Sequence, residues 1–384
     1  MEKKELSDEL STNIDKHCIA LIDENKKHKT EISNALSYLY KIVDINETFD
    51  IFDILRDTPP AAILIGEKTG YIGSLRFIRT LRQIPSLRRT VVIFIADRYD
   101  PDVQNAATLV GANDVLAKPY RRSTLIRMVS SHLNAQVERT WTDMPDMERQ
   151  ALEGTMSAFT LIADAMAGQG RVPFEVVKNS CSSLVDAVNN GRFRRVLNGI
   201  RHHDNYSYAH SLRVATLLSI FGKHARLAKS DQLTLASAGL LHDTGKMAIP
   251  HEILNKPGLL DDAERAVMRS HVPETVRYLK ASHGIPGSII AIAEQHHEKL
   301  NGQGYPHGLK GGQINELVRM AAIVDVFSAL TDRRPYKPPF MAEKALSIMS
   351  EEMPGHLDMS YVRLFREILL DAATGTDLPL GPGP

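Results

Sequence analysis

The sequence predicts a multidomain protein with an N-terminal α/β domain, doubly wound around five parallel strands, and an all-α C-terminal part. Three observations support this prediction. Short runs that are apolar at every position recur in the first third of the chain, as in strands buried on both faces. Amphipathic stretches lie between or after these runs. After residue 133 the strand signals stop, and from about residue 147 the apolar residues follow helical spacing.

The expected elements alternate along the N-terminal domain. Strands are expected at residues 18–23, 42–45, 61–66, 91–96 and 114–117, and helices at residues 30–40, 72–81 and 123–133. We place the α/β domain at residues 15–135 and a helical linker with the start of the helical domain at 136–200. The main helical domain is expected at 201–370, and a disordered Pro/Gly-rich tail at 371–384.

The composition excludes several classes of protein. The chain has 384 residues, and 46 Lys and Arg residues balance 46 Asp and Glu residues, unlike the basic excess of a general nucleic-acid binder. Two separated cysteines cannot form a disulfide framework. There is no apolar signal segment, and no run approaches the roughly 18 apolar residues of a membrane helix. We therefore expect a cytoplasmic protein that binds neither a nucleic-acid polymer nor a membrane.

Histidine is concentrated in the helical part, where eleven of the 15 histidines lie between His202 and His307. Asp325 interrupts an apolar helix, where an unpaired carboxylate is costly to bury. Five of the histidines and two aspartates are candidate metal ligands. Seven ligands are too many for one tetrahedral zinc site, but they suit two six-coordinate ions that share a bridging Asp. Mixed imidazole and carboxylate ligation fits iron, manganese or zinc better than Mg²⁺ or Ca²⁺. The candidate metal ligands are His210, His242, Asp243, His271, His296, His297 and Asp325.

The candidate ligands lie on separate helical segments. His271 is expected within a helix that begins at Asp261, because Glu264 follows that residue at the spacing of a capping box. His296 and His297 are adjacent, so on a helix their side chains project about 100° apart. We therefore expect these two imidazoles to face two different metal ions.

These residues, and the segments between them, resemble the HD-GYP family, a subgroup of the HD-domain metal-dependent phosphohydrolases, over about residues 150–370. The resemblance rests on the His242-Asp243 pair, the HHE of residues 296–298, the GxGYP of 302–306 and the GLKG of 308–311. It also includes DVFSALT at 325–331 and RPYK at 334–337. It implies an HD-domain helical bundle that hydrolyses cyclic di-GMP to pGpG, with onward hydrolysis to GMP left open.

The resemblance also implies roles for single residues. All seven candidates would be metal ligands, with Asp243 bridging two ions, of which iron is the first expectation and manganese or zinc the alternatives. Members with a third metal carry a Glu where this chain has Tyr206, so we expect two ions. Asp243 and Lys246 are expected to be catalytic, and Glu298 to be a hydrogen-bond partner of a ligand imidazole. The expected substrate-binding residues are Lys246, Tyr305, Arg334 and Lys337.

Structural alternatives stay open for these substrate-binding residues. Lys246 is alternatively a solvated lysine at a helix end, Arg334 and Lys337 surface salt-bridge partners, and the glycine-rich segment around Tyr305 a structural turn. The chain also departs from the family pattern at Leu300, Asn301 and residues 332–333. No departure removes a proposed ligand.

Residues 15–135 resemble a response-regulator receiver domain. Asp23 and Glu24 match the acidic pair that holds Mg²⁺ in that family, and Lys118 with the following proline matches its Lys-Pro pair. Gly66, however, stands where the phosphoacceptor Asp is expected, and Ile95 replaces a Ser or Thr. We therefore expect a degenerate receiver that is not phosphorylated and serves in dimerisation or partner docking, with its acidic residues as remnants.

Three hypotheses for function remain open. The first is a cyclic di-GMP phosphodiesterase, with a homodimer through the receiver or the helical linker as its candidate assembly. The second is a non-catalytic HD-GYP adaptor that acts on a partner such as a diguanylate cyclase or a motility protein. The third keeps the chemistry but changes the substrate to another cyclic dinucleotide or phosphoester.

Overall fold

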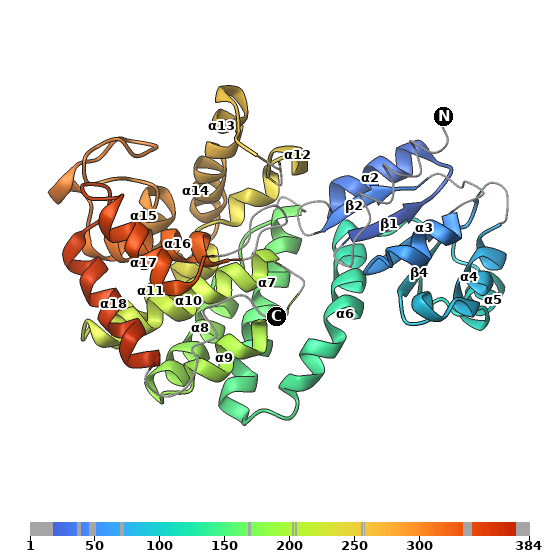
Figure 1. Ribbon diagram of the computed structural model, residues 1–384, viewed down its shortest axis with the longest axis horizontal. Coiled ribbons are helices and arrows are strands. Elements are labelled where there is room, and N and C mark those ends of the chain that lie inside the picture. The colour runs from blue at the N-terminus through green and yellow to red at the C-terminus, as the bar shows by residue number, and fades with distance from the viewer. Residues whose placement is uncertain are drawn as a thin grey trace. The chain divides into compact units, whose positions relative to one another are not determined.

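The computed structural model describes residues 18–36, 40–45, 51–69, 73–167, 170–201, 203, 206–254, 256, 258–332 and 340–373. The chain divides into two compact units, residues 1–136 and 137–384. Figure 1 shows that the first unit holds the β-sheet and that the second is built from helices. Within the described residues, no helix is both long enough and apolar enough to cross a membrane.

The first unit contains a five-stranded parallel sheet in the order β2-β1-β3-β4-β5. This order is that of a doubly wound, flavodoxin-like sheet. The expected strands and the doubly wound fold are therefore confirmed. The strands are β1 (Cys18–Ile22), β2 (Lys41–Asp44), β3 (Ala62–Gly66), β4 (Val91–Ala96) and β5 (Asp114–Ala117).

Helices cover both faces of this sheet. Ile19 and Leu21 of β1 pack in one apolar cluster with α2 (Lys26–Leu36) and α6 (Arg122–Trp141). Ala20 and Ile22, whose side chains point to the other face, pack in a second cluster with α3 (Ile51–Asp57), α4 (Ser74–Gln83) and α5 (Pro101–Leu109). A short 3-10 helix, η1 (Pro85–Leu87), follows α4.

Two helices of the first unit were missed in the sequence, and one was displaced. Neither α3 nor α5 was expected, and α2 begins four residues before the expected start at residue 30. For α5 a signal was present, because Asp100 accepts the backbone N–H groups of Asp102 and Val103 and Pro101 opens the first turn.

The second unit is helical around one apolar core. Its central helix, α10 (Tyr206–His224), contacts α8 (Phe174–Asn189), α9 (Phe193–Ile200), α11 (Lys229–Leu241) and α16 (Glu316–Thr331). Gly239 permits the close approach of α10 and α11, because a Cβ atom there would lie 2.6 Å from the Ala215 Cα atom. The other helices are α7 (Asp146–Ala167), α12 (His251–Leu254), α13 (Asp262–Arg269), α14 (His271–Ala281), α15 (Gly287–Gln295), α17 (Ala342–Glu351), α18 (Met359–Ala373) and the 3-10 helices η2 (Thr244–Ala248) and η3 (Gly311–Gln313).

The helix expected to carry His271 from an N-cap at Asp261 is wrong in its extent. Asp261 does form the capping box with Glu264, but α13 ends at Arg269 and His271 is the first residue of α14. The break has a local cause, since Pro273 lacks a backbone N–H and its ring clashes with the carbonyl of Arg269 in a continuous helix. His271 therefore lies at a helix start.

Candidate metal centre

All seven candidate ligands converge at one place in the helical unit. Each sits at the end of an element or on the inner face of a helix. His210 lies on α10, His271 on α14 and Asp325 on α16, all of them buried. The remaining four lie in connections: His242 is the C-cap of α11, Asp243 precedes η2, His296 is the C-cap of α15, and His297 follows it.

Asp243 joins two groups of ligand atoms. Its Oδ1 atom lies 3.3 Å from His271 Nε2 and 3.8 Å from His296 Nε2. Its Oδ2 atom lies 3.3 Å from His242 Nε2 and 3.6 Å from His210 Nε2. One carboxylate oxygen thus faces each group, which is the geometry expected of a bridging ligand.

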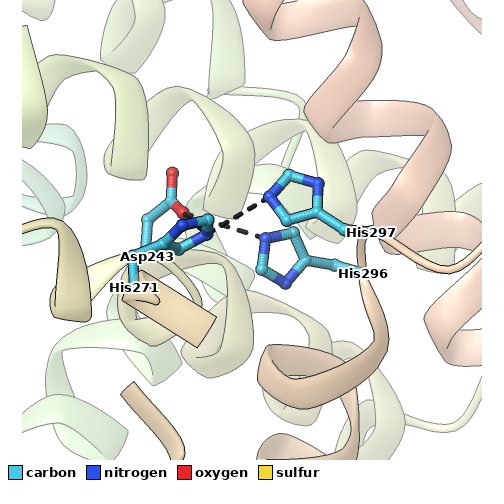
Figure 2. Close-up of side chains that lie close together, drawn as sticks. All are labelled: Asp243, His271, His296 and His297. Atoms are coloured by element: carbon cyan, nitrogen blue, oxygen red, sulfur yellow. Dashed lines mark hydrogen bonds and ion pairs between the residues drawn. The ribbon is translucent and has the colours of Figure 1, made fainter. Parts of the chain in front are cut away.

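The first group contains Asp243, His271, His296 and His297, and Figure 2 shows their side chains pointing toward one another. The Nε2 atoms of His297 and His271 are 3.2 Å apart. The second group contains His210, His242, Asp243 and Asp325. Within each group the ligand atoms all lie within 4.8 Å of one another.

His296 and His297 belong to the same group, contrary to the expectation that they face two ions. The expectation assumed that both residues lie within a helix. Helix α15 ends at Gln295, so the 100° rotation per residue no longer applies to His297. The two imidazole centroids lie only 4.0 Å apart.

The donor set fits divalent cations. The Nδ1 atoms of His242, His271 and His296 each contact the backbone carbonyl three residues earlier, which turns their Nε2 atoms into the cluster. Among the described residues, the buried His242 Nε2, His296 Nε2 and Asp243 Oδ1 atoms have no hydrogen-bond partner. Buried polar atoms that converge without partners are costly unless an ion coordinates them.

The electrostatics of the pocket favour ionised carboxylates and neutral imidazoles on the first group. Burial alone would raise the pKa of Asp243, but the Lys246 ammonium and His242 hold it well below its usual range. Burial lowers the pKa of His297 to about 4, and it holds the pKa of His296 well below the usual value. These are the protonation states that carboxylate and imidazole ligands require.

The second group differs because two carboxylates face its imidazoles. Burial would lower the pKa of His242, but the negative charges of Asp243 and Asp325 raise it to about 9. Burial likewise opposes the ionised form of Asp325, whereas the imidazoles of His210 and His242, whose Nε2 atoms each lie 3.6 Å from its Oδ1 atom, hold its pKa well below the usual range. Without a metal, protons on these imidazoles supply the positive charge that balances the two carboxylates. A divalent cation would displace these protons when it binds.

Comparison with known proteins identifies the fold that carries this centre. A family model described as an HD domain matches residues 196–361, which include all seven candidate ligands. Residues 196–361 are an HD domain. The match confirms the HD-domain resemblance drawn from the His242-Asp243 pair.

Three relatives have named activities. The chain is 35% identical over 211 residues to cyclic di-GMP phosphodiesterase PA4108 of Pseudomonas aeruginosa, covering 54% of this chain and 50% of that protein. It is 38% identical over 155 residues to 3'3'-cGAMP-specific phosphodiesterase 3 of Vibrio cholerae, covering 40% of this chain and 33% of that protein. It is 27% identical to cyclic di-GMP phosphodiesterase response regulator RpfG of Xanthomonas campestris pv. campestris, over 86% of this chain and 82% of that protein. The chain thus spans half or less of the first two relatives.

Tyr305 and Lys246 lie at the edge of the metal centre in the HD domain. The Tyr305 ring stacks on the His297 imidazole, with centroids 4.7 Å apart. The guanidinium of Arg269 lies over the Tyr305 ring, 4.9 Å from the ring centroid. This contact was not predicted from the sequence. Lys246 Nζ forms an ion pair with Asp243 Oδ2. Arg334 and Lys337 lie outside the described residues.

Glu298 of the HD domain has a different role from the one expected. Its carboxylate is buried and accepts backbone N–H groups of His307 at 2.6 Å, Gly308 at 3.1 Å and Leu309 at 3.0 Å. The side chain therefore closes the loop that carries Tyr305 and does not pair with a ligand imidazole. The HHE motif gave no indication of these hydrogen bonds, because the backbone amides that Glu298 binds lie nine to eleven residues after it in the sequence.

The acidic pocket of the first unit is filled by contacts within the protein. Asp23 Oδ2 lies 2.6 Å from His28 Nδ1, while Asp23 Oδ1 accepts the Asn25 backbone N–H. Lys118 Nζ donates to Asp97 Oδ1 at 2.9 Å. A Cβ atom at Gly66 would lie 2.6 Å from Asp23 Oδ2, so the Asp23 carboxylate occupies the space that a side chain at residue 66 would need.

Proposed function

We propose that the HD domain hydrolyses a phosphodiester bond of cyclic di-GMP, giving pGpG, at two divalent ions held by the seven candidate ligands. The observation that carries this proposal is the position of Asp243, with one oxygen toward each group of ligand atoms. The names of PA4108 and RpfG support the choice of substrate. Onward hydrolysis of pGpG to GMP is an outcome that the assay distinguishes.

The donor set also supports a choice of metal. Five imidazoles and two carboxylates suit iron, with manganese or zinc as alternatives, better than ions that prefer only oxygen ligands. When bound, two such ions would supply Lewis-acid activation of water and neutralise negative charge as it develops on the phosphate. The first group would hold one ion and the second group the other, with Asp243 in common.

The protein residues around the ions bind and orient the ester. Lys246 forms an ion pair with Asp243, and its ammonium would bind a non-bridging phosphate oxygen as a point charge. The Tyr305 ring stacks on His297, where it would contact the phosphate or a guanine of the dinucleotide. Glu298 fixes the loop under Tyr305 through three backbone hydrogen bonds. Because the ligands are buried, the attractive charges act in a medium of low dielectric constant.

We also propose that the N-terminal unit works without phosphorylation. Gly66 offers no carboxylate, and Asp23 and Lys118 already have partners within the protein. Glu67, next to Gly66, accepts the backbone N–H of Asp97 at 2.7 Å and is engaged as well. Dimerisation or docking of a cyclase or motility protein through this unit stays a prediction.

The test is hydrolysis by the full chain. Purified protein is loaded anaerobically with Fe²⁺ or Mn²⁺, incubated with cyclic di-GMP and analysed for pGpG and GMP by chromatography. We expect turnover by the natural sequence and none by Asp243→Ala, with circular dichroism to show that the variant is folded. Tight binding of cyclic di-GMP without turnover would instead favour the adaptor hypothesis.

A second candidate substrate is 3'3'-cGAMP, because one relative specific for that dinucleotide is 38% identical over 155 residues. The same assay, run with both dinucleotides at equal concentration, separates the two substrates by the ratio of their kcat/KM values. We expect cyclic di-GMP to give the larger value.

A further inference from the structure

The ligand histidines differ in what holds their outer nitrogen. His242 Nδ1 lies 2.9 Å from the Gly239 carbonyl oxygen, and His296 Nδ1 lies 2.9 Å from that of Ala293. His271 Nδ1 lies 2.7 Å from the Met268 carbonyl oxygen. His210 Nδ1 instead lies 2.6 Å from a carboxylate oxygen, Oδ2 of Asp332. Of these four ligand histidines, His210 is thus the one with a charged side chain at this nitrogen.

The position of each histidine in its helix explains this difference. His242 and His296 are C-caps, and His271 follows the C-cap of α13. The last carbonyls of a helix lack intrahelical partners, so they can accept an imidazole N–H. His210 lies inside α10, where carbonyls bond to amides four residues later. An imidazole at that position requires an acceptor from another element.

Asp332 is held in place for this contact. It is the C-cap of α16, and its backbone N–H donates to the Ser328 carbonyl at 2.8 Å. Its second carboxylate oxygen, Oδ1, lies 2.9 Å from Nη1 of Arg213, which is three residues beyond His210 on α10. The side chain of Asp332 is 5% exposed, that of His210 7% and that of Arg213 15%. One buried carboxylate therefore connects the ligand to an arginine on the same helix.

We propose that Asp332 is a positioning residue for the metal centre. It keeps the proton of neutral His210 on Nδ1 and turns Nε2 toward Asp243 and Asp325, each 3.6 Å away. Arg213 in turn keeps the carboxylate in place. The inference rests on the proposed two-metal function, and it adds a residue on which the second group of ligands depends.

The expected effect is selective for one ion. His210 belongs to the group with His242, Asp243 and Asp325, and it does not belong to the group with His271, His296 and His297. Removal of an outer partner of a ligand histidine lowers metal affinity by about 10- to 100-fold. Loss of Asp332 should therefore weaken one of two binding steps and leave the other unchanged.

The test is a titration of metal-free Asp332→Asn full-length protein with Co²⁺, followed by visible absorption and by competition with a chelator. We expect one ion to bind with unchanged affinity and the other about 10- to 100-fold more weakly. Glu148→Gln is the matched control, because Glu148 is a 1% exposed carboxylate 3.3 Å from Arg195 outside the metal centre. We expect it to change neither binding step.

Two further variants make the outcome decisive. If Asp332 acts through His210, the double variant His210→Ala/Asp332→Asn should bind the second ion no more weakly than His210→Ala alone. Should Asp332→Asn not fold, Arg213→Gln keeps the carboxylate but removes its tether and should weaken the same binding step. Unchanged affinities for both ions in a folded Asp332→Asn protein would overturn the inference. Failure of the natural sequence to bind two ions would instead contradict the proposed function.

Discussion

The two units of this chain each bring histidine, aspartate and lysine close together, and the two clusters differ in how their polar atoms are satisfied. In the N-terminal unit, Asp23 pairs with His28, and Lys118 pairs with Asp97. In the HD domain, His242 Nε2 and Asp243 Oδ1 have no hydrogen-bond partner among the described residues. The outer nitrogens of His210, His242, His271 and His296, by contrast, contact backbone carbonyls or Asp332.

This difference is the basis for the proposal that one cluster binds metal and the other does not. A pocket whose donors and acceptors are matched within the protein is stable without a ligand, so it has little to gain from a cation. A pocket in which acceptors converge at 3.3–3.8 Å without donors between them is costly until positive charge enters it. Residue type alone does not distinguish the two pockets. The predictions that follow test this difference, beginning with the largest effect.

Substitution of Asp243 should have the largest effect. Asp243→Ala removes the carboxylate common to both ligand groups, so both ions should bind weakly and turnover should fall by more than about 10³-fold, since loss of a single electrostatic donor already costs about 10²–10³. Asp23→Ala, the corresponding change in the first unit, should leave metal content and turnover unaltered. Plasma mass spectrometry and the hydrolysis assay measure both. A metal-replete, active Asp243→Ala protein would contradict the bridging role.

The next effect concerns the packing that positions His271. A Cβ atom at Gly245 would lie 2.0 Å from the His271 carbonyl oxygen and 2.6 Å from the Thr275 backbone nitrogen. Gly245→Ala should therefore lower the free energy of unfolding by about 1–3 kcal/mol or more, through overpacking against backbone that cannot move aside. Gly287→Ala is the control, because nothing lies within 4 Å of a Cβ atom there. Equal urea midpoints for the two variants would refute this packing argument.

A smaller effect is expected at Glu298. In Glu298→Gln, an amide N–H₂ group replaces one of the oxygens that accept the backbone N–H groups of residues 307–309. The free energy of unfolding should fall by about 1–3 kcal/mol, and the amides of residues 307–309 should exchange hydrogen faster. Glu153→Gln, an exposed change on α7, should alter neither. Unchanged exchange at residues 307–309 would show that Glu298 does not hold this loop.

The smallest effect is expected from an attempt to restore the phosphoacceptor. Gly66→Asp supplies the missing carboxylate, but its Cβ atom would meet Asp23 Oδ2 at 2.6 Å. We expect no covalent phosphate after incubation of the full chain with acetyl phosphate, measured by intact-protein mass spectrometry beside a receiver known to accept phosphate. A mass increase of one phosphoryl group in Gly66→Asp would show that the pocket can still open.

Much of this architecture was predictable, because the relevant signals are local. Buried parallel strands appear as uninterrupted apolar runs, and all five were found. The candidate ligands were also visible, since His242, Asp243 and Asp325 are polar residues in apolar helical surroundings. The helices α3 and α5 were missed because they are short, and the extent of the helix before His271 was wrong because Pro273 was not taken as a break.

The grouping of the ligands and their supporting contacts could not be read from the sequence. Whether His296 and His297 face one ion or two depends on where α15 ends. The helix ends at Gln295, directly before His296, and the sequence does not define a helix end to within one residue. Asp332 was noted only as a departure from the family pattern. One signal was available for it: it follows Asp325 by seven residues, and on a helix that spacing places two side chains on the same face, although Asp332 is the C-cap of α16. Its partner, His210, lies 122 residues away.

The number of metal ions per chain tests the central claim most directly. The full chain is made metal-free, loaded anaerobically with Mn²⁺ or Fe²⁺, freed of unbound metal and measured by plasma mass spectrometry against protein concentration. Two groups of ligands that share Asp243 predict two ions per chain in the natural sequence, with both lost or strongly weakened in Asp243→Ala. One ion or none per folded natural chain, or two ions that persist in Asp243→Ala, would contradict the account.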